Sequence, residues 1–360
     1  MQALFTEVLI TYNGQDISKD LRPYLLSFTF TDNAKGKADD ISLTLQDSGG
    51  EWLRDWLPAK SDTITASILT PQQSLPCGSF SVDQADYSFP PHTLSIKGVS
   101  SDVTRSAVTE LKTYVWGNMD IKSIAAEIAS RNGLALFFDG GGGSVERAEQ
   151  IEQTDLEFLR QLAGDFGLSV KVQKDKLIVY DTAEYEAKPE ALTIEQGDKR
   201  LLTCRFSTKT VKVYRKARLR YHHPVKNEDY DEEAEDDDEE GSERTLEIHE
   251  RAETAGDAKR IATQRLLEAN RKEITGSITL TGDTRLAAGV TVMLSGFGMF
   301  SGKHFVNKVT HKVDSGGYTT TIELGQPKQE KGKSHSRKAA RKKTGGTRGE
   351  IFYEGEHYYR

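Results

Sequence analysis

The sequence contains few of the residues and motifs on which catalytic and metal sites depend. It has two cysteines in 360 residues, Cys77 and Cys204, and no C-x-x-C pair, which excludes a zinc knuckle and a dithiol motif. The four glycines at 140–143 are not followed by Gly-Lys-Ser or Gly-Lys-Thr, so they predict a flexible turn and not a phosphate-binding loop. The G-x-S-x-G motif of serine hydrolases is also missing.

Histidine patterns fall short of a metal site as well. His249 and Glu250 begin an H-E-x-x-H pattern, but the fifth residue is Glu253 and not histidine. His222 and His223 stand together beside a charged segment, and no third ligand follows at a spacing typical of metal sites. We therefore predict no catalytic residue, no metal ion and no cofactor in this chain.

Long apolar runs are missing too. Hydrophobic residues make up 36% of the chain, and no run reaches the roughly 18 apolar residues of a membrane-spanning helix. The N-terminal segment lacks a basic stretch followed by an unbroken apolar core, so it predicts no signal peptide. The net charge of -7 is modest and favours no particular partner. We expect a protein that contacts no membrane and is assembled in a cytosol.

What the sequence has instead is many short alternating strands. Residues 6–12 are rich in β-formers and end in Asn13-Gly14, a strong hairpin signal that places a partner strand near Gln15. Residues 51–57 predict a short connecting helix. Residues 1–99 therefore predict an antiparallel barrel or sandwich domain. Its predicted apolar faces consist of Leu26, Phe28, Phe30, Ile41, Leu43, Leu45, Ile64, Ala66, Ile68, Phe80, Val82, Leu94 and Ile96.

Residues 100–190 have the pattern of a small α+β domain. Asp120 is placed to cap a helix with apolar residues at 121, 124, 125, 128 and 129, and Gly133 is placed to end it. Thr154 and Glu157 form a T-x-x-E capping box in front of a second helix. The runs at 168–172 and 176–180 predict a β-hairpin.

Residues 191–325 return to strands, with one helix predicted at about 255–270 and capped by Thr254 or Asp257. The predicted strands include alternating runs within 201–221 and further runs at 275–281, 290–294, 304–311 and 318–324. The first and third regions look like two versions of one architecture. We therefore predict an α+β, mainly β fold with an α+β domain inserted between two β-rich domains.

Two charged segments differ from this domain pattern. Residues 228–243 hold twelve acidic residues in sixteen positions and no base, which predicts a disordered loop because the charges repel one another. Residues 328–348 carry nine lysines and arginines against Glu330, so 326–360 begins as a basic linker. The last eleven residues then hold four aromatics, which predicts that this end binds another protein. The predicted partner-binding residues are Ile351, Phe352, Tyr353, Tyr358 and Tyr359.

The order of these motifs resembles the phage late control D family, the baseplate hub proteins of contractile tails. The most specific stretch is the helix with Ala255, Ala258, Ala262 and Leu266, then a strand, then GDTRLAAG at 282–289. It continues with a Gly-Phe-Gly at 296–298, a Val-Thr-His at 309–311 and a Gly-Tyr-Thr-Thr at 317–320. The other cues are TDLEFLRQLA at 154–163 and the helix at 121–132. The match covers roughly residues 1–325.

The resemblance implies a structural role. It implies two tail-tube-like β-barrel domains, at 1–99 and 191–325, around the inserted domain at 100–190. Three copies would form a ring of six barrels that joins a threefold central spike to a sixfold tail tube and nucleates tube assembly. The implied partners are a second and third copy of the chain, the spike protein, the tube protein and other baseplate proteins, with the tape measure protein as a further candidate. The implied location is the distal end of a tail or tail-like particle assembled in a bacterial cytoplasm.

Two other functions remain as alternatives. The first is a peptidoglycan-degrading tail enzyme, although only about 35 residues follow the last predicted strand. The second is a nucleic-acid-binding regulator that acts through the basic segment, since flexible cations attract phosphate. We favour the solvated linker over nucleic-acid binding because no folded nucleic-acid motif accompanies the charges.

Overall fold

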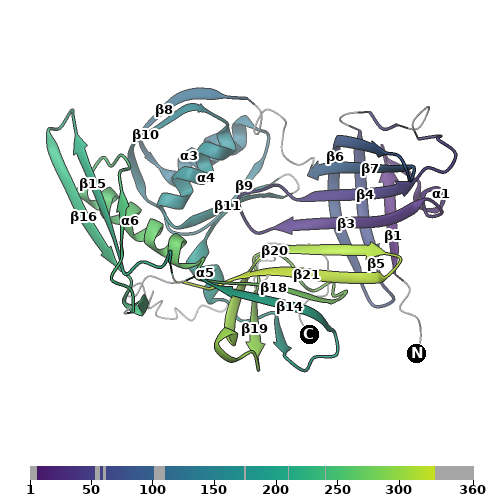
Figure 1. Ribbon diagram of the computed structural model, residues 1–360. Helices are drawn as coiled ribbons and strands as arrows, with labels where there is room; N and C mark the ends of the chain where they lie inside the picture. The colour runs from purple at the N-terminus through teal and green to yellow at the C-terminus, as the bar shows by residue number, and fades with distance from the viewer. Residues whose placement is uncertain are drawn as a thin grey trace, which may run out of the picture.

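The structure is a computed structural model that describes residues 6–52, 57–59, 62–100, 110–173, 176–209, 211–239 and 241–328. Strands dominate these residues, which agrees with the mainly β fold expected from the sequence. One sheet runs through the molecule and takes strands from both ends of the described chain, while two smaller helix-containing units lie to one side (Figure 1).

The N-terminal part of the sheet follows the predicted alternation. Its elements are β1 (Glu7–Tyr12), β2 (Gln15–Asp16), β3 (Leu25–Asn33), β4 (Asp40–Gln46), β5 (Thr63–Leu69), β6 (Ser74–Ser88) and β7 (Thr93–Ser100), with the one-turn helix α1 (Ser18–Leu21). The hairpin after β1 is confirmed, because Asn13 and Gly14 both have a positive φ, as a tight primed turn requires. The predicted inward residues from Phe28 to Ile96 are buried in one cluster.

One predicted inward residue of this region is wrong. Leu26 is 42% exposed, because the register of β3 against β4 shifts between Leu25 and Ser27. A bulge of this kind adds one residue to one strand, so that the side chains before it point to the opposite face of the sheet from the one that the alternation predicts. The helix expected at 51–57 falls largely outside the described residues.

The C-terminal strands extend the same sheet. They are β13 (Leu192–Glu195), β14 (Leu201–Thr208), β18 (Ile274–Thr281), β19 (Thr291–Ser295), β20 (Gly302–Asp314) and β21 (Gly317–Gly325), with the 3-10 turn η2 (Gly298–Phe300). β20 pairs antiparallel with β3, so that His311 lies opposite Phe30. The two β-rich regions, the first ending at Ser100 and the second beginning at Leu192, therefore share one sheet in the order β14-β18-β21-β20-β3-β4-β7-β6-β5-β1-β2.

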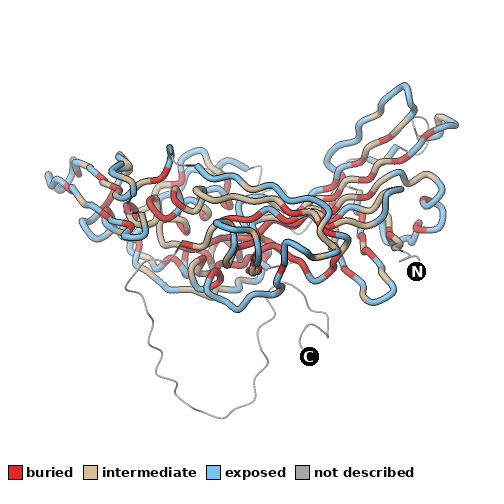
Figure 2. The backbone as a smooth tube through the Cα atoms, turned by 60° about the horizontal axis from the view of Figure 1, so that its bottom comes forward, coloured by how far each residue is buried: buried red, intermediate tan, exposed pale blue. Residues whose placement is uncertain are grey.

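The sheet is open in the described part of the chain. Its order does not return to its starting strand, so the described strands close no barrel on their own. Figure 2 shows buried residues following the strands through the middle of the molecule, with exposed segments at both ends. No described helix is long and apolar enough to cross a membrane.

The predicted α+β unit contains β8 (Lys112–Asp120), α3 (Ile121–Arg131), β9 (Ala135–Asp139), β10 (Ser144–Gln153), α4 (Asp155–Asp165), β11 (Leu168–Gln173), β12 (Lys176–Asp181) and α5 (Thr182–Ala187). The capping box is confirmed, with the Thr154 hydroxyl accepting from the backbone N–H of Glu157. Asp120 is the N-cap residue of α3, but its carboxylate accepts from the backbone N–H of Gly143 (3.0 Å) and not from its own helix. The apolar faces of α3 and α4 pack against β9, β11 and β12 around one core.

A second helix-containing unit lies inside the third region and was not predicted. It consists of β15 (Lys216–His223), β16 (Glu228–Glu235), the 3-10 turn η1 (Asp237–Glu239), β17 (Thr245–Ile248) and α6 (Ala255–Asn270). The strands pack one face on α6, which buries Ala217, Leu219, Tyr230 and Ile248. The Thr254 hydroxyl, and not Asp257, caps α6 by accepting from the N–H of Asp257 (3.0 Å).

The prediction that the acidic block 228–243 is a disordered loop is wrong. Residues 228–239 form β16 and η1, and β16 lies antiparallel to the basic strand β15. Lys216 Nζ is 2.7 Å from Glu235 Oε1, and Arg218 pairs with Asp231. Alternation then turns Tyr230 towards the helix. The acidic strand is ordered because a basic strand neutralises one of its faces and its other face has apolar residues to bury.

Candidate assembly surfaces and the junction that positions them

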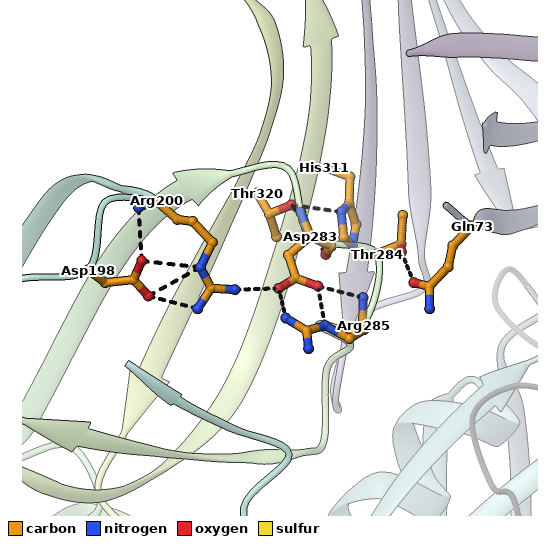
Figure 3. A network of polar contacts seen from close by, with 8 residues as sticks. All are labelled: Gln73, Asp198, Arg200, Asp283, Thr284, Arg285, His311 and Thr320. Atoms are coloured by element: carbon orange, nitrogen blue, oxygen red, sulfur yellow. Dashed lines mark hydrogen bonds and ion pairs between the residues drawn. The ribbon is translucent and has the colours of Figure 1, made fainter. Parts of the chain in front are cut away.

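The loop at 282–289, between β18 and β19, holds the two halves of the sheet together (Figure 3). The Thr284 hydroxyl donates to Gln73 Oε1 in the turn between β5 and β6 (2.6 Å). The Ala288 backbone N–H donates to the carboxylate of Asp32 on β3 (2.7 Å). Both partners belong to the N-terminal half, so this loop fixes its position relative to the C-terminal half.

Two arginines hold Asp283 at the start of this loop (Figure 3). The Asp283 side chain is 8% exposed, with Arg285 Nη2 at 2.6 Å and Arg200 Nη1 at 3.1 Å. Arg200 also donates to both carboxylate oxygens of Asp198. Burial alone would raise the pKa of Asp283, but its hydrogen bonds to Arg285 and the charges of Arg285 and Arg200 outweigh burial and lower it.

His311 lies beneath the same loop and is fully buried. Its ring stacks on Phe30, with centroids 6.0 Å apart and planes 10° apart. Nε2 lies 3.2 Å from the Leu286 carbonyl, and Nδ1 lies 2.8 Å from the Tyr318 hydroxyl. The carbonyl accepts only, so Nε2 carries the proton and Nδ1 accepts from Tyr318. Burial lowers the pKa of His311 to about 4, so the ring is neutral at pH 7.

A buried ion cluster fixes the α+β unit to the sheet. Lys171 on β11 lies 2.5 Å from Asp32 Oδ1 and 3.3 Å from Asp39 Oδ2, and its side chain is 1% exposed. Burial by itself would lower the pKa of Lys171, but Asp32 and Asp39 outweigh that effect and raise it. Burial and the nearby Asp32 raise the pKa of Asp39, against the opposing charge of Lys171. Asp32 therefore joins the N-terminal half of the sheet, where it lies on β3, to the α+β unit through Lys171 and to the C-terminal half through Ala288.

The large sheet has several unpaired strand edges within the described chain, and two of them, on β14 and on the second half of β6, are well exposed. β14 pairs with β18 only, and Leu202, Thr203, Cys204 and Arg205 are all exposed. β6 pairs with β5 through its first half and with β7 through its second half. Residues 83–88 therefore have one free edge, and most of them are exposed on both faces. Exposed, unpaired strand edges are natural sites for another chain to bind.

The partner-binding residues predicted from the sequence are not among the residues that form these surfaces. Ile351, Phe352, Tyr353, Tyr358 and Tyr359 fall outside the described residues, as does most of the basic segment. His223 is buried and its Nε2 lies 3.0 Å from Glu253 Oε2, so the residue that interrupts the H-E-x-x-H pattern is a hydrogen-bond partner. The described residues contain no group of three or more His, Cys, Asp or Glu side chains placed to hold a metal ion. Sequence reasoning missed Asp32 and Lys171, since lone polar residues in strands give no signal of burial, and it identified His311 only as part of a family motif.

The chain was then compared with known proteins. The family model described as phage tail baseplate hub (GPD) matches residues 77–317, which is more than half of the sequence. The chain belongs to this baseplate hub family. The match includes the loop at 282–289 and all of β20, which together join the two halves of the sheet. The members are structural tail components, in agreement with the prediction that the chain is not an enzyme.

Individual relatives agree with this assignment. A probable baseplate hub protein of Escherichia phage P2 is 27% identical over 178 residues, which cover 49% of this chain and 45% of that protein. The 43 kDa tail protein of prophage MuSo2 from Shewanella oneidensis has a TM-score of 0.72 at 15% identity, with 90% of this chain and 99% of that chain covered. An E. coli component of the type VI secretion system has a TM-score of 0.53 at 11% identity, with 85% and 74% covered. The chain spans about half the length of the curated relative.

Proposed function

We propose that this chain is a structural baseplate hub that forms a trimeric, pseudo-sixfold ring between a central spike and the tail tube. The family assignment supports the hub role. The two β-rich regions support two tube-like, barrel-forming units in each copy. The likeness in fold to a type VI secretion component, described as similar to the phage T4 tail proteins gp27 and gp5, is consistent with a spike as the partner below the ring.

The arrangement of strands supports ring closure through the sheet. Eight strands from β14 to β6 follow one another in the order β14-β18-β21-β20-β3-β4-β7-β6, and every neighbouring pair is antiparallel. Because the number is even, the second half of β6 and β14 run in opposite directions. β14 of one copy can therefore pair antiparallel with residues 83–88 of the next copy. This head-to-tail contact repeats around the ring and leaves no free edge on the eight strands.

The same arrangement explains how one chain matches a threefold spike to a sixfold tube. Four of the eight strands come from the N-terminal half and four from the C-terminal half. Each copy then contributes two comparable four-stranded segments to the inner wall of the ring, so three copies contribute six such segments. The junction at Asp32, Thr284 and His311 sets the angle between the two segments within a copy. The aromatic residues near the C-terminus remain the proposed contact with a neighbouring baseplate protein.

Disulfide trapping in assembled tails tests the ring. Cys204 is exposed on β14 and Cys77 is buried, so the native chain has one accessible thiol. Cysteines introduced singly as Gln84→Cys, Ala85→Cys and Asp86→Cys sample the register of β6, because a disulfide needs Cβ atoms about 3.5–4.5 Å apart. At least one variant should give a covalent, closed trimer on oxidation.

Two controls make the result specific. Adding Cys204→Ser to each variant should abolish the covalent trimer. A Ser315→Cys variant at the β20–β21 turn should give no disulfide-linked species. Tails that assemble normally but give no linked species with any of the three positions would contradict pairing between β14 and β6.

A further inference from the structure

The sheet β16-β15-β17 has an acidic edge that the proposed ring does not use. β16 pairs with β15 only, so no described strand lies along its other edge, although Lys259 of α6 donates to the backbone carbonyl of Glu233. Residues 228–239 contain ten acidic side chains, whereas the facing strand β15 offers Lys216, Arg218 and Arg220 as its lysines and arginines. The bases on β15 therefore balance only part of the charge.

The basic segment begins beside the C-terminal end of β16. Lys328, its first cation, is 5% exposed and pairs with Glu239 of η1, with Asp236 at 3.8 Å and Glu273 at 3.9 Å. Its backbone N–H donates to Glu186 Oε2 (3.1 Å), and its carbonyl accepts from Arg271 Nη2 (3.0 Å). Lys328 is thus part of the fold and not of a free linker, which corrects the boundary expected at 326.

The acidic cluster keeps a surplus of negative charge around Lys328. Burial and the neighbouring Glu239 raise the pKa of Glu273, although Lys328 acts in the opposite direction. One lysine therefore does not neutralise the cluster at the point where β16 ends and the basic segment starts. Additional cations are attracted to this place, and residues 331–348 bring eight of them on the same chain.

We propose that residues 331–343 of each chain lie along the acidic edge of β16 in the same chain. The reach is sufficient, because eight residues of β16 span about 26 Å and thirteen extended residues span up to about 43 Å. The anchor at Lys328 holds the cations at a millimolar effective concentration, which favours the same chain over a neighbouring copy. The docked segment covers an edge that is otherwise open to pairing with another sheet.

Carbodiimide cross-linking of the full-length protein tests this arrangement. The reagent joins lysines to carboxylates that are in contact, and mass spectrometry then identifies the linked peptides. We expect links from Lys331, Lys333 or Lys338 to residues 228–239 at about 50 mM salt. These links should largely disappear at 1 M salt, where the screening length falls to about 3 Å.

A matched pair of variants separates charge from composition. Replacing Arg337, Arg341 and Lys342 by Glu should lower the yield of these links about tenfold, and replacing the same residues by Gln should lower it less. An equal mixture of isotopically heavy and light protein identifies the source of the segment. Cross-links that join peptides of the same isotope, with no mixed pairs, support the proposal. Mixed pairs, cross-links confined to other surfaces, or a cross-link yield that does not change on charge reversal would overturn it. The outcome is independent of the ring, because the test is made on the separate chain.

Discussion

Acidification should destabilise the junction through His311. The folded chain holds this imidazole neutral, with a pKa of about 4, whereas the unfolded chain exposes it with an ordinary pKa of about 6.5. The unfolded state therefore binds more protons between pH 4 and pH 6.5. The contribution of the neutral ring to the free energy of unfolding is fully present above pH 6.5 and is lost as the pH falls towards 4.

The magnitude follows from the difference between the two pKa values. A shift of this size corresponds to about 3 kcal/mol in total, of which about 2 kcal/mol is lost between pH 7 and pH 5. Glutamine at position 311 removes the titrating group. At pH 7 the free energy of unfolding of the His311→Gln variant should be lower than that of the native protein, because glutamine does not replace the ring contacts of His311. This difference in free energy should shrink by about 2 kcal/mol at pH 5, because only the native ring becomes protonated.

Urea denaturation followed by tryptophan fluorescence at pH 5, 6, 7 and 8 measures both proteins under the same conditions. Other carboxyl groups that titrate in this range contribute equally to both proteins and cancel in the difference between their free energies of unfolding. One of them is Asp165, where burial raises the pKa to about 6. Replacing the exposed His222 by glutamine controls for the substitution itself. A gap between native and His311→Gln protein that is constant from pH 5 to pH 8 would refute the reasoning.

Two further predictions concern the packing of the junction. Asp32→Asn should lower the free energy of unfolding by about 3–5 kcal/mol, since it leaves Lys171 buried beside one carboxylate. Combining it with Lys171→Met should recover most of the loss. Equal stabilities of the single and the double variant would argue against a coupled pair. Gly282→Ala should destabilise the fold by about 1–3 kcal/mol, because its new Cβ would lie 1.9 Å from the ring of Tyr318. Gly141→Ala, where nothing lies within 4 Å, should be neutral in the same urea denaturation assay.

Much of the local structure follows from sequence. The alternation of Ile41, Leu43 and Leu45 predicted β4, and the Thr154–Glu157 capping box predicted the start of α4, because each signal depends on neighbours within a few residues. The order of motifs also led to the correct family. Leu26 was assigned to the wrong face, since a bulge depends on the partner strand and leaves no mark in the alternating pattern.

The candidate assembly surfaces were less predictable. The sequence alone determined that the chain is mainly β, that it lacks common catalytic and metal motifs, and that its charges gather in two segments of opposite sign. Only the tertiary structure decided that β3 pairs with β20, that an acidic strand is ordered by a basic neighbour, and that Asp32 and Lys171 form a buried pair. Each of these depends on residues brought together from tens to hundreds of positions apart, where strand register and burial are set by the whole fold and not by local pattern.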